Sequence, residues 1–214
     1  MKFVKPSFQI LTELNEEQIL RNIEIAGRTC YKSEDKITGE SARAFVEMII
    51  KRGHLTVIEH EKITIRFVCD RGVSHELVRH RICSFSQEST RYCNYTKMKF
   101  GNDLTFIQPC FWMDLPESND VEKHAVLEET LLHLEMAYKS LIDLGASPQE
   151  ARYILPNGLK TEIVVTANLR QWRLILQQRA VKAAHPQMRE IMIPLLRELQ
   201  HQLPSLFNDI IIYE

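Results

Sequence analysis

The sequence predicts an α/β (α+β) fold that is rich in helix and built as a single domain over residues 1–214. Residues 62–68 alternate apolar and polar side chains, which is typical of a half-buried strand. Residues 161–167 are apolar and β-branched, which predicts a second strand. Residues 118–143 carry leucines and a tyrosine at helical spacing, which predicts a long helix. Strands separated by helices along one chain indicate a mixed class.

Caps and helix breakers predict the remaining elements. Residues 8–11 form a possible edge strand, and Asn15 caps a helix over residues 16–29. A second helix over residues 40–51 ends at Gly53, and the apolar side chains near one of its faces are Ala44, Phe45 and Met48. The other predicted elements are a short helix over residues 74–81, a loop over 84–95, a capping box over 147–150, a helix over 169–182, and a last helix from Pro186 with a kink or break at Pro194.

Composition argues against several classes of protein. Hydrophobic residues make up 44% and charged residues 26% of the chain, as in an ordinary soluble domain. The formal net charge of -1 argues against a protein that binds nucleic acid or an anionic membrane. The five cysteines form no paired framework, so we expect a reducing cytoplasm. The sequence has no signal-like segment and no apolar run of ~18 residues, so secretion and membrane spanning are not expected.

The basic residues gather in two segments, residues 77–99 and 149–189, although the chain is nearly neutral. The first segment contains Arg-His-Arg at residues 79–81, seven further residues, and Ser-x-Arg at residues 89–91. Guanidinium groups bind phosphate and carboxylate oxygens two at a time. The two segments therefore predict one positive, anion-binding cleft.

The predicted helix over residues 74–81 would separate the two arginines of Arg-His-Arg. Side chains two positions apart on a helix point about 200° apart, so Arg79 and Arg81 could not easily hold one phosphate. This geometry indicates two ligands, or two neighbouring sites at a subunit contact. A solvated basic turn is the alternative, and the downstream Ser89 and Arg91 favour the functional interpretation.

Two further clusters carry chemistry. His54, Glu59 and His60 suggest a metal site, but the helical spacing of metal-binding histidines is absent, and a structural hydrogen-bonding role is favoured for His60. Asn168 and Arg179 lie eleven residues apart, about three helical turns, so they share one stripe of the predicted helix.

Four ordered elements give the chain a resemblance to the flavin-dependent thymidylate synthases. The first is the Arg-His-Arg and Ser-x-Arg signature at residues 79–91. The second is His-x-Thr-x-x-x-His at residues 54–60, and the third is Ala-Arg-x-x-Leu-Pro at residues 151–156. The fourth is Asn-x-Arg at residues 168–170, followed by Arg179. The resemblance covers roughly residues 54–190.

The resemblance implies a fold, a reaction and an assembly. The fold would be one helix-rich domain around a mainly antiparallel sheet. The enzyme would be a methyltransferase that makes dTMP from dUMP, with FAD as cofactor, methylenetetrahydrofolate as one-carbon donor and NADPH as reductant. It would be a homotetramer with active sites shared between subunits. The dinucleotide fingerprint Gly-x-Gly-x-x-Gly is absent, as it is in that family.

The resemblance also implies site residues by position. The dUMP contacts would be Glu76, Leu77, Val78, Arg79, Gln87, Glu88, Ser89, Thr90, Arg91, Arg152 and Arg179. The FAD contacts would be Thr56, Arg79, His80, Arg81, Gln87, Asn168, Leu169 and Arg170, with His54 close to flavin and folate. The sequence departs from the family pattern at Leu174, where relatives often have Asn or His, and at Gln87, where Glu is common.

The reaction requires uracil C5 to become nucleophilic. A guanidinium beside the ring stabilises the negative charge that builds there, and Arg179 is the candidate for this role. The scheme needs no protein nucleophile, so we expect Cys83 to be a packing residue and Ser89 to be a ligand to the nucleotide.

Two alternative functions stay open. A nucleic-acid-binding module would lose affinity steeply with salt, and its contacts would be Arg79, Arg81, Arg91 and Tyr92. A hydrolytic metalloenzyme would use His54, Glu59 and His60.

Overall fold

The computed structural model describes residues 1–112 and 118–212. The chain forms two compact units. Unit 1 comprises Met1–Ser7, Phe67–Arg79 and Ser86–Ile163, and unit 2 comprises Phe8–Arg66, His80–Phe85 and Val164–Glu214. The boundary after Arg79 falls inside the Arg-His-Arg run. The prediction of one domain over residues 1–214 stays a prediction.

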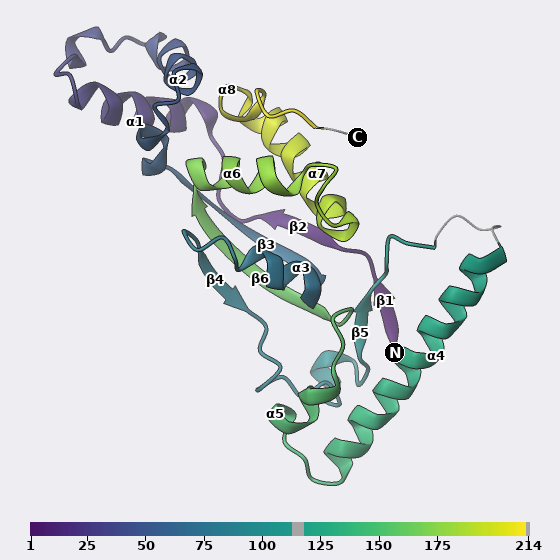
Figure 1. Cartoon of the computed structure of the whole chain (residues 1–214). Helices are drawn as coiled ribbons and strands as arrows, with labels where there is room; N and C mark the ends of the chain where they lie inside the picture. The colour runs from purple at the N-terminus through teal and green to yellow at the C-terminus, as the bar shows by residue number, and fades with distance from the viewer. Residues whose placement is uncertain (113–117, 213–214) are drawn as a thin grey trace. The chain divides into compact units, whose positions relative to one another are not determined.

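The larger sheet contains four strands in the order β2-β3-β6-β4 and is mainly antiparallel, as Figure 1 shows. Its strands are β2 (Ser7–Ile10), β3 (Lys62–Asp70), β6 (Lys160–Asn168) and β4 (Ser84–Gln87). A smaller parallel pair joins β1 (Lys2–Val4) to β5 (Thr105–Ile107), with Lys2 opposite Thr105. Together with the helices, these sheets confirm the α/β (α+β) class.

Helices follow and precede these strands along the chain. They are α1 (Glu16–Thr29), α2 (Ser41–Lys51), α3 (Arg71–Leu77), α4 (Ser118–Asp143), α5 (Pro148–Ala151), α6 (Leu169–Arg179), α7 (Pro186–Gln202) and α8 (Pro204–Phe207). Short 3-10 turns are η1 (Glu34–Lys36), η2 (Leu55–His60), η3 (Met98–Phe100) and η4 (Arg152–Ile154). No helix in the described ranges has the length and apolar composition needed to cross a bilayer.

The elements predicted from local signals are confirmed. The side chain of Asn15 accepts a hydrogen bond from the Gln18 N–H at 3.1 Å and starts α1. The Ser147 N–H donates to Glu150 Oε2 at 2.8 Å, which is one half of the predicted capping box. The edge strand β2, the central strands β3 and β6, and the long helix α4 also lie where the sequence places them.

Two predictions around the signature are wrong. The short helix α3 begins at Arg71, because Asp70 Oδ1 accepts from the Val73 N–H at 2.8 Å, and it ends at Leu77. Residues 79–81 therefore lie beyond the helix, and the helical argument that separates Arg79 from Arg81 no longer holds. The segment predicted as a loop begins with strand β4, which pairs with β6, a partner far away in sequence.

Three further details differ from the sequence-based expectation. Helix α6 ends at Arg179 and not at residue 182. Helix α7 runs on through Pro194, so the predicted break is wrong. The buried side chains of α2 are Ala42, Val46 and Ile49, whereas Ala44 is exposed and Phe45 and Met48 are only half-buried.

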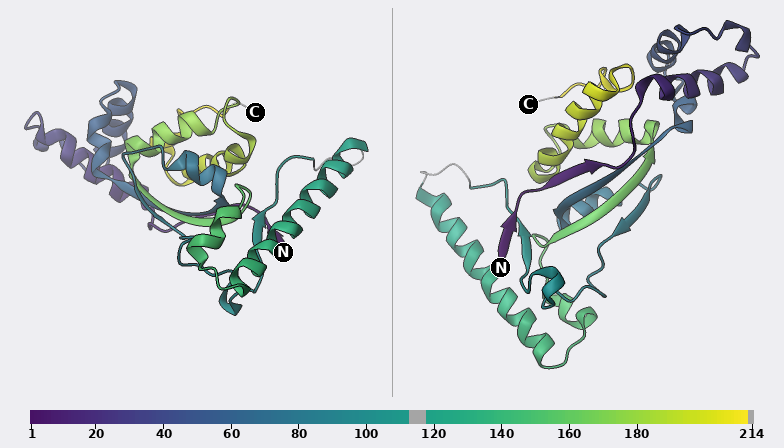
Figure 2. Two further views of the ribbon diagram at one scale, coloured as in Figure 1. Left: turned by 60° about the horizontal axis from the view of Figure 1, so that its bottom comes forward. Right: turned by 180° about the vertical axis from the view of Figure 1, so that it is seen from behind.

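Each unit has its own apolar core. In unit 1, Leu131 and Tyr138 of α4 pack with Phe106 of β5, and α4 lies beside β1 and β5 in both views of Figure 2. In unit 2, the fully buried Trp172 donates its indole N–H to the Ile63 carbonyl at 2.9 Å. This bond ties α6 to β3, because the buried indole N–H needs a partner.

Alternate residues of β6 face opposite sides of the sheet, so substitutions at two neighbouring valines should lower the free energy of unfolding by different amounts. Val165 is fully buried, whereas Val164 points to the half-buried face. Val165→Ala should lower the free energy of unfolding by about 2 kcal/mol, because two buried methyl groups are lost and a cavity remains. Val164→Ala is the matched control and should cost clearly less. Chemical denaturation measures both, and equal losses would contradict the assigned faces.

Candidate functional site

The end of β6 fixes where helix α6 begins. Asn168 is the last residue of the strand, and its Oδ1 accepts from the Gln171 N–H at 2.8 Å. An N-terminal cap of this kind satisfies one backbone donor that the helix leaves unpaired. The helix then runs eleven residues and ends at Arg179. The predicted stripe is confirmed, since Trp172 and Ile175 on it are buried.

Arg179 makes a direct contact with the signature. Its Nε donates a hydrogen bond to His80 Nε2 at 3.1 Å, and His80 is 6% exposed. An imidazole that accepts at Nε2 carries its proton on Nδ1 and is neutral. The contact therefore holds the Arg179 guanidinium at its Nε atom. It joins two residues that are 99 positions apart in the sequence.

A cavity of about 380 Å³ beside α6 contains two of the residues predicted to contact FAD, Asn168 and Arg170. Arg170 Nη1 donates to Glu59 Oε1 at 2.7 Å, and both side chains are largely exposed. Leu174, which replaces a polar residue of relatives, also lines this cavity and is 41% exposed. Leu169 differs from its neighbours, because its side chain is fully buried and its N–H donates to the Glu61 carbonyl at 2.9 Å.

A larger cavity of about 840 Å³ lies between α1, α2 and η2 in unit 2. His54 and Thr56 are both exposed and both line it. The exposed Ala44 and the half-buried Phe45 and Met48 of α2 line it as well, which explains why they are not in the core. In the described ranges, no group of three or more His, Cys, Asp or Glu residues could hold a metal ion, so the His54–His60 cluster gains no support as a metal site.

Residues of the signature stretch in unit 1 bond to other residues of the same unit. Gln87 Nε2 donates to Ser74 Oγ at 2.9 Å and to Thr161 Oγ1 at 3.2 Å, so both of its amide hydrogens are used. Glu88 is half-buried and pairs with Lys160, with 2.9 Å between Oε2 and Nζ. Its backbone N–H donates to the Glu162 carbonyl at 2.9 Å.

The next residues of the stretch, Ser89, Arg91 and Tyr92, contact one another. Ser89 Oγ accepts from the Arg91 N–H at 3.3 Å, and Thr90 is buried. The guanidinium of Arg91 is exposed and lies 5.4 Å from the centre of the Tyr92 ring. Among the residues preceding the signature, Leu77 is buried in the core, whereas Glu76 is half-buried and Val78 is 40% exposed.

Three predicted arginines carry available positive charge. Arg79, Arg81 and Arg152 are exposed, and within the described ranges none of their guanidinium groups has a hydrogen-bond or ion-pair partner. Unpaired guanidinium groups at the surface can accept a phosphate or carboxylate without first breaking a protein contact.

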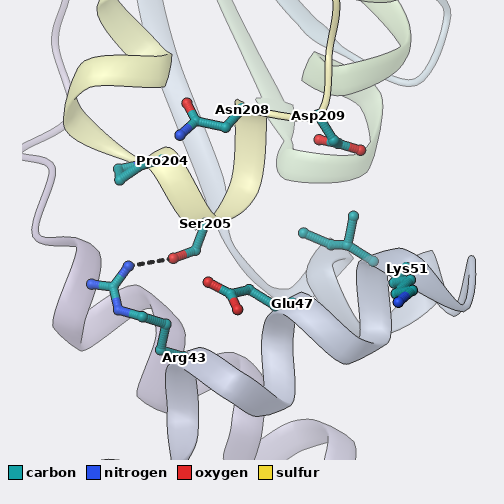
Figure 3. A pocket seen from close by; sticks show the side chains of 8 residues that line it. Arg43, Glu47, Lys51, Pro204, Ser205, Asn208 and Asp209 are labelled. Carbon is teal, nitrogen blue, oxygen red and sulfur yellow. Dashed lines mark hydrogen bonds between the residues drawn. The ribbon is translucent and has the colours of Figure 1, made fainter.

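The cavity between α2 and α8 in Figure 3 contains none of the predicted site residues. Among its polar groups, Arg43 donates to Ser205 Oγ at 2.5 Å, as Figure 3 shows, and Arg43 also donates to Glu16 Oε2 outside the cavity lining at 2.7 Å. This cavity is therefore a weaker candidate than the two beside η2 and α6.

Several polar residues near the predicted site were missed by the sequence analysis. They are Glu59 as the partner of Arg170, Ser74 and Thr161 as the partners of Gln87, and Lys160 and Tyr95 as the partners of Glu88. Glu59 had a signal, because the sequence analysis names it with His54 and His60, whereas no local pattern pairs the others with their partners.

The chain is an α+β protein whose motif arginines Arg79, Arg81 and Arg152 are exposed. Residues 12–205 match the family model described as thymidylate synthase complementing protein. A flavin-dependent thymidylate synthase of Geobacter sulfurreducens is 31% identical over 194 residues, which cover 87% of this chain and 80% of the relative. Those of Corynebacterium glutamicum and Mycolicibacterium gilvum are 33% and 35% identical, each covering 87% of this chain and 78% of the relative.

The chain therefore belongs to the flavin-dependent thymidylate synthase family. The resemblance inferred from the four motifs is thereby confirmed.

Cys83, inside the signature, should be chemically inert at neutral pH. Burial raises the pKa of its thiol to about 11. At pH 8 roughly a thousandth of it is thiolate, the reactive form. Iodoacetamide should therefore label the exposed Cys30 long before Cys83, and labelling of Cys83 should quicken with pH up to about 11. Peptide mass spectrometry measures both sites, and rapid labelling of Cys83 at pH 7 would contradict this assignment.

Proposed function

We propose that this protein is a thymidylate synthase that converts dUMP to dTMP, with FAD as cofactor, methylenetetrahydrofolate as one-carbon donor and NADPH as reductant. The observation that carries the proposal is a set of exposed guanidinium groups in a chain of this family: those of Arg79, Arg81 and Arg152 have no partner among the residues that the structure describes. Anionic substrates and an anionic cofactor require such groups.

The residues of unit 2 fit FAD. The donor set comprises the Thr56 hydroxyl, the Asn168 amide and the guanidinium groups of Arg81 and Arg170, which suit a pyrophosphate and the polar edge of a flavin ring. Thr56 lines the cavity of about 840 Å³ beside η2, whereas Asn168 and Arg170 line the separate cavity of about 380 Å³, and both volumes are within the usual range of small-molecule sites. The side chain of Leu169 is buried in the core, so a contact from this position would come from its backbone.

The residues of unit 1 suit the nucleotide. Arg79, Arg91 and Arg152 supply exposed positive charge for the phosphate, and Ser89 supplies a hydroxyl. The side chains of Glu88 and Gln87 already bond to other residues of unit 1. We therefore assign them a structural role, which is to fix the conformation of the signature stretch. Glu76, Val78 and Thr90 complete the proposed dUMP set, with Leu77 contributing through its backbone.

Arg179 is the proposed activating residue. Its guanidinium would stabilise the negative charge that builds on the uracil ring as C5 becomes nucleophilic. The hydrogen bond to His80 orients this guanidinium before substrate arrives, which lowers the cost of reorganisation during the reaction. Reduced FAD supplies the electrons that complete the methyl group. No side chain of this chain is assigned as a nucleophile, and the high pKa of Cys83 agrees with that assignment.

The assembly and location belong to the same proposal. They are a homotetramer with active sites shared between subunits and a location in the cytoplasm. Arg79 would then serve the nucleotide, and Arg81 the flavin.

Complementation tests the proposed function. A bacterium that lacks thymidylate synthase should grow without thymidine when it expresses this chain. Arg179→Gln should abolish that growth at equal protein level, whereas Lys62→Gln, an exposed change elsewhere, should not. The purified protein should also show flavin absorbance that NADPH bleaches. Colourless protein that refuses FAD and fails to support growth would overturn the proposal.

Substitutions at His80 distinguish a role in orienting Arg179 from a role in contacting the flavin. His80→Leu should lower kcat about 10- to 100-fold, because Arg179 loses a charge-assisted hydrogen bond worth about 1.5–3 kcal/mol. His80→Gln keeps an acceptor and should restore part of the rate. FAD affinity, measured by fluorescence titration, should stay unchanged in both. A loss of FAD affinity with kcat intact would show instead that His80 acts on the cofactor.

A further inference from the structure

A third cavity, of about 590 Å³, lies wholly within unit 1 and contains none of the proposed catalytic residues. Its walls come from β1 and the residues after it, from η3, and from β5 and β6. The volume is in the usual range for small ligands. The charged side chains that line it are Lys2, Lys5, Lys99, Lys160, Glu88 and Glu162. Four lysines and two glutamates leave an excess of positive charge in a chain whose net charge is -1.

Four of the side chains that line this cavity are joined by ion pairs and a hydrogen bond. Lys160 Nζ lies 2.9 Å from Glu88 Oε2 and 2.8 Å from Glu162 Oε1, and the Tyr95 hydroxyl donates to Glu88 Oε1 at 2.7 Å. Burial alone would lower the pKa of Lys160, but the hydrogen bonds to Glu162 and Glu88 outweigh it and raise that pKa. Lys160 thus stays charged, and its positive charge neutralises much of the negative charge of the Glu88 and Glu162 carboxylates.

The other three lysines have no such partner. Lys2, Lys5 and Lys99 are exposed, and in the described part of the chain no carboxylate pairs with any of them. Lys99 Nζ lies 4.8 Å from the centre of the Phe100 ring. Three exposed ammonium groups around one cavity give it a positive potential that attracts negative charge.

A glycine also lines this cavity. Gly101 has φ 81°, a left-handed conformation that favours glycine. A Cβ atom there would stand 3.3 Å from Lys2 Nζ, the far end of a flexible side chain, so the backbone conformation and not the space accounts for glycine at this position.

We propose that this cavity binds a small polyanion, a short chain of phosphate or carboxylate groups that bridges Lys2, Lys5 and Lys99. Apart from Glu88, the residues that line this cavity are not among the dUMP and FAD contacts that the resemblance implies, and the proposal does not depend on the proposed reaction. Glu88 links the two, because its side chain lines the cavity while its backbone belongs to the signature stretch.

Calorimetric titration of the purified full-length protein, carrying its flavin, tests this site. The probes are tripolyphosphate and tetraglutamate at low salt, each with and without saturating dUMP. Wild type should bind at least one probe, and dUMP should not displace it. Lys5→Gln/Lys99→Gln should weaken binding by at least about tenfold, since two charges near the ligand are lost. Lys51→Gln/Lys62→Gln removes two exposed lysines elsewhere and should leave the affinity unchanged.

The outcomes separate the sources of the anion. Binding of tripolyphosphate alone assigns the cavity to phosphate compounds, and binding of tetraglutamate alone assigns it to polycarboxylates. Failure of both probes, equal losses in the two double variants, or displacement by dUMP would each overturn the proposal. Binding of dUMP itself is measured in the same titrations, so a defect in the nucleotide site is recognised separately.

Discussion

Two side-chain caps at the ends of the central strands determine where the charged residues stand. Strand β3 ends at Asp70, which caps α3, and strand β6 ends at Asn168, which caps α6. Each cap accepts one backbone N–H and so fixes the first turn of its helix, typically for about 1 kcal/mol. Because a helix has a fixed rise and turn per residue, fixing its first turn also sets the direction of each later side chain of that helix. Arg79 follows the first of these helices closely, and Arg179 closes the second.

These junctions explain both successes and failures of the sequence analysis. Residues 16–29 and 147–150 were predicted correctly, because their caps lie just before the helix and follow a loop signal. Asp70 was missed as a cap, because it closes an apolar strand run with no loop between strand and helix. The helix therefore begins earlier than expected, and Arg79 and Arg81 fall outside it.

Long-range contacts were beyond the reach of local patterns. Strand β4 is short and becomes a strand only because β6 lies beside it. His80 and Arg179, and likewise Glu88 and Lys160, meet across 99 and 72 residues, so neither spacing nor periodicity could pair them. The motif resemblance identified the family correctly, because its residues are specified by position and need no knowledge of contacts. It could not assign a role to each residue, as the buried Leu169 and the internally bonded Gln87 illustrate.

The two compact units give the proposed site a simple organisation. Of the residues that the resemblance implies, the dUMP contacts other than Arg179 lie in unit 1, and the FAD contacts other than Arg79 and Gln87 lie in unit 2. The assignment of Arg79 and Arg81 to different ligands rests on the family resemblance, because the helical argument no longer holds. The account thus depends on one claim, that this chain makes dTMP with an arginine-activated uracil.

The most direct test is product formation by the purified protein. Chromatography would follow dTMP made from dUMP in the presence of FAD, methylenetetrahydrofolate and NADPH, with each component omitted in turn. The account predicts dTMP in the complete mixture and none when any one component is removed. It also predicts a rate at least about 100-fold lower for Arg179→Lys, because lysine keeps the charge but lacks the planar guanidinium and the Nε–H bond to His80, and losing a preorganised donor to a developing anion typically costs that much. Folded, flavin-loaded protein that makes no dTMP, or an Arg179→Lys variant with the full rate, would contradict it.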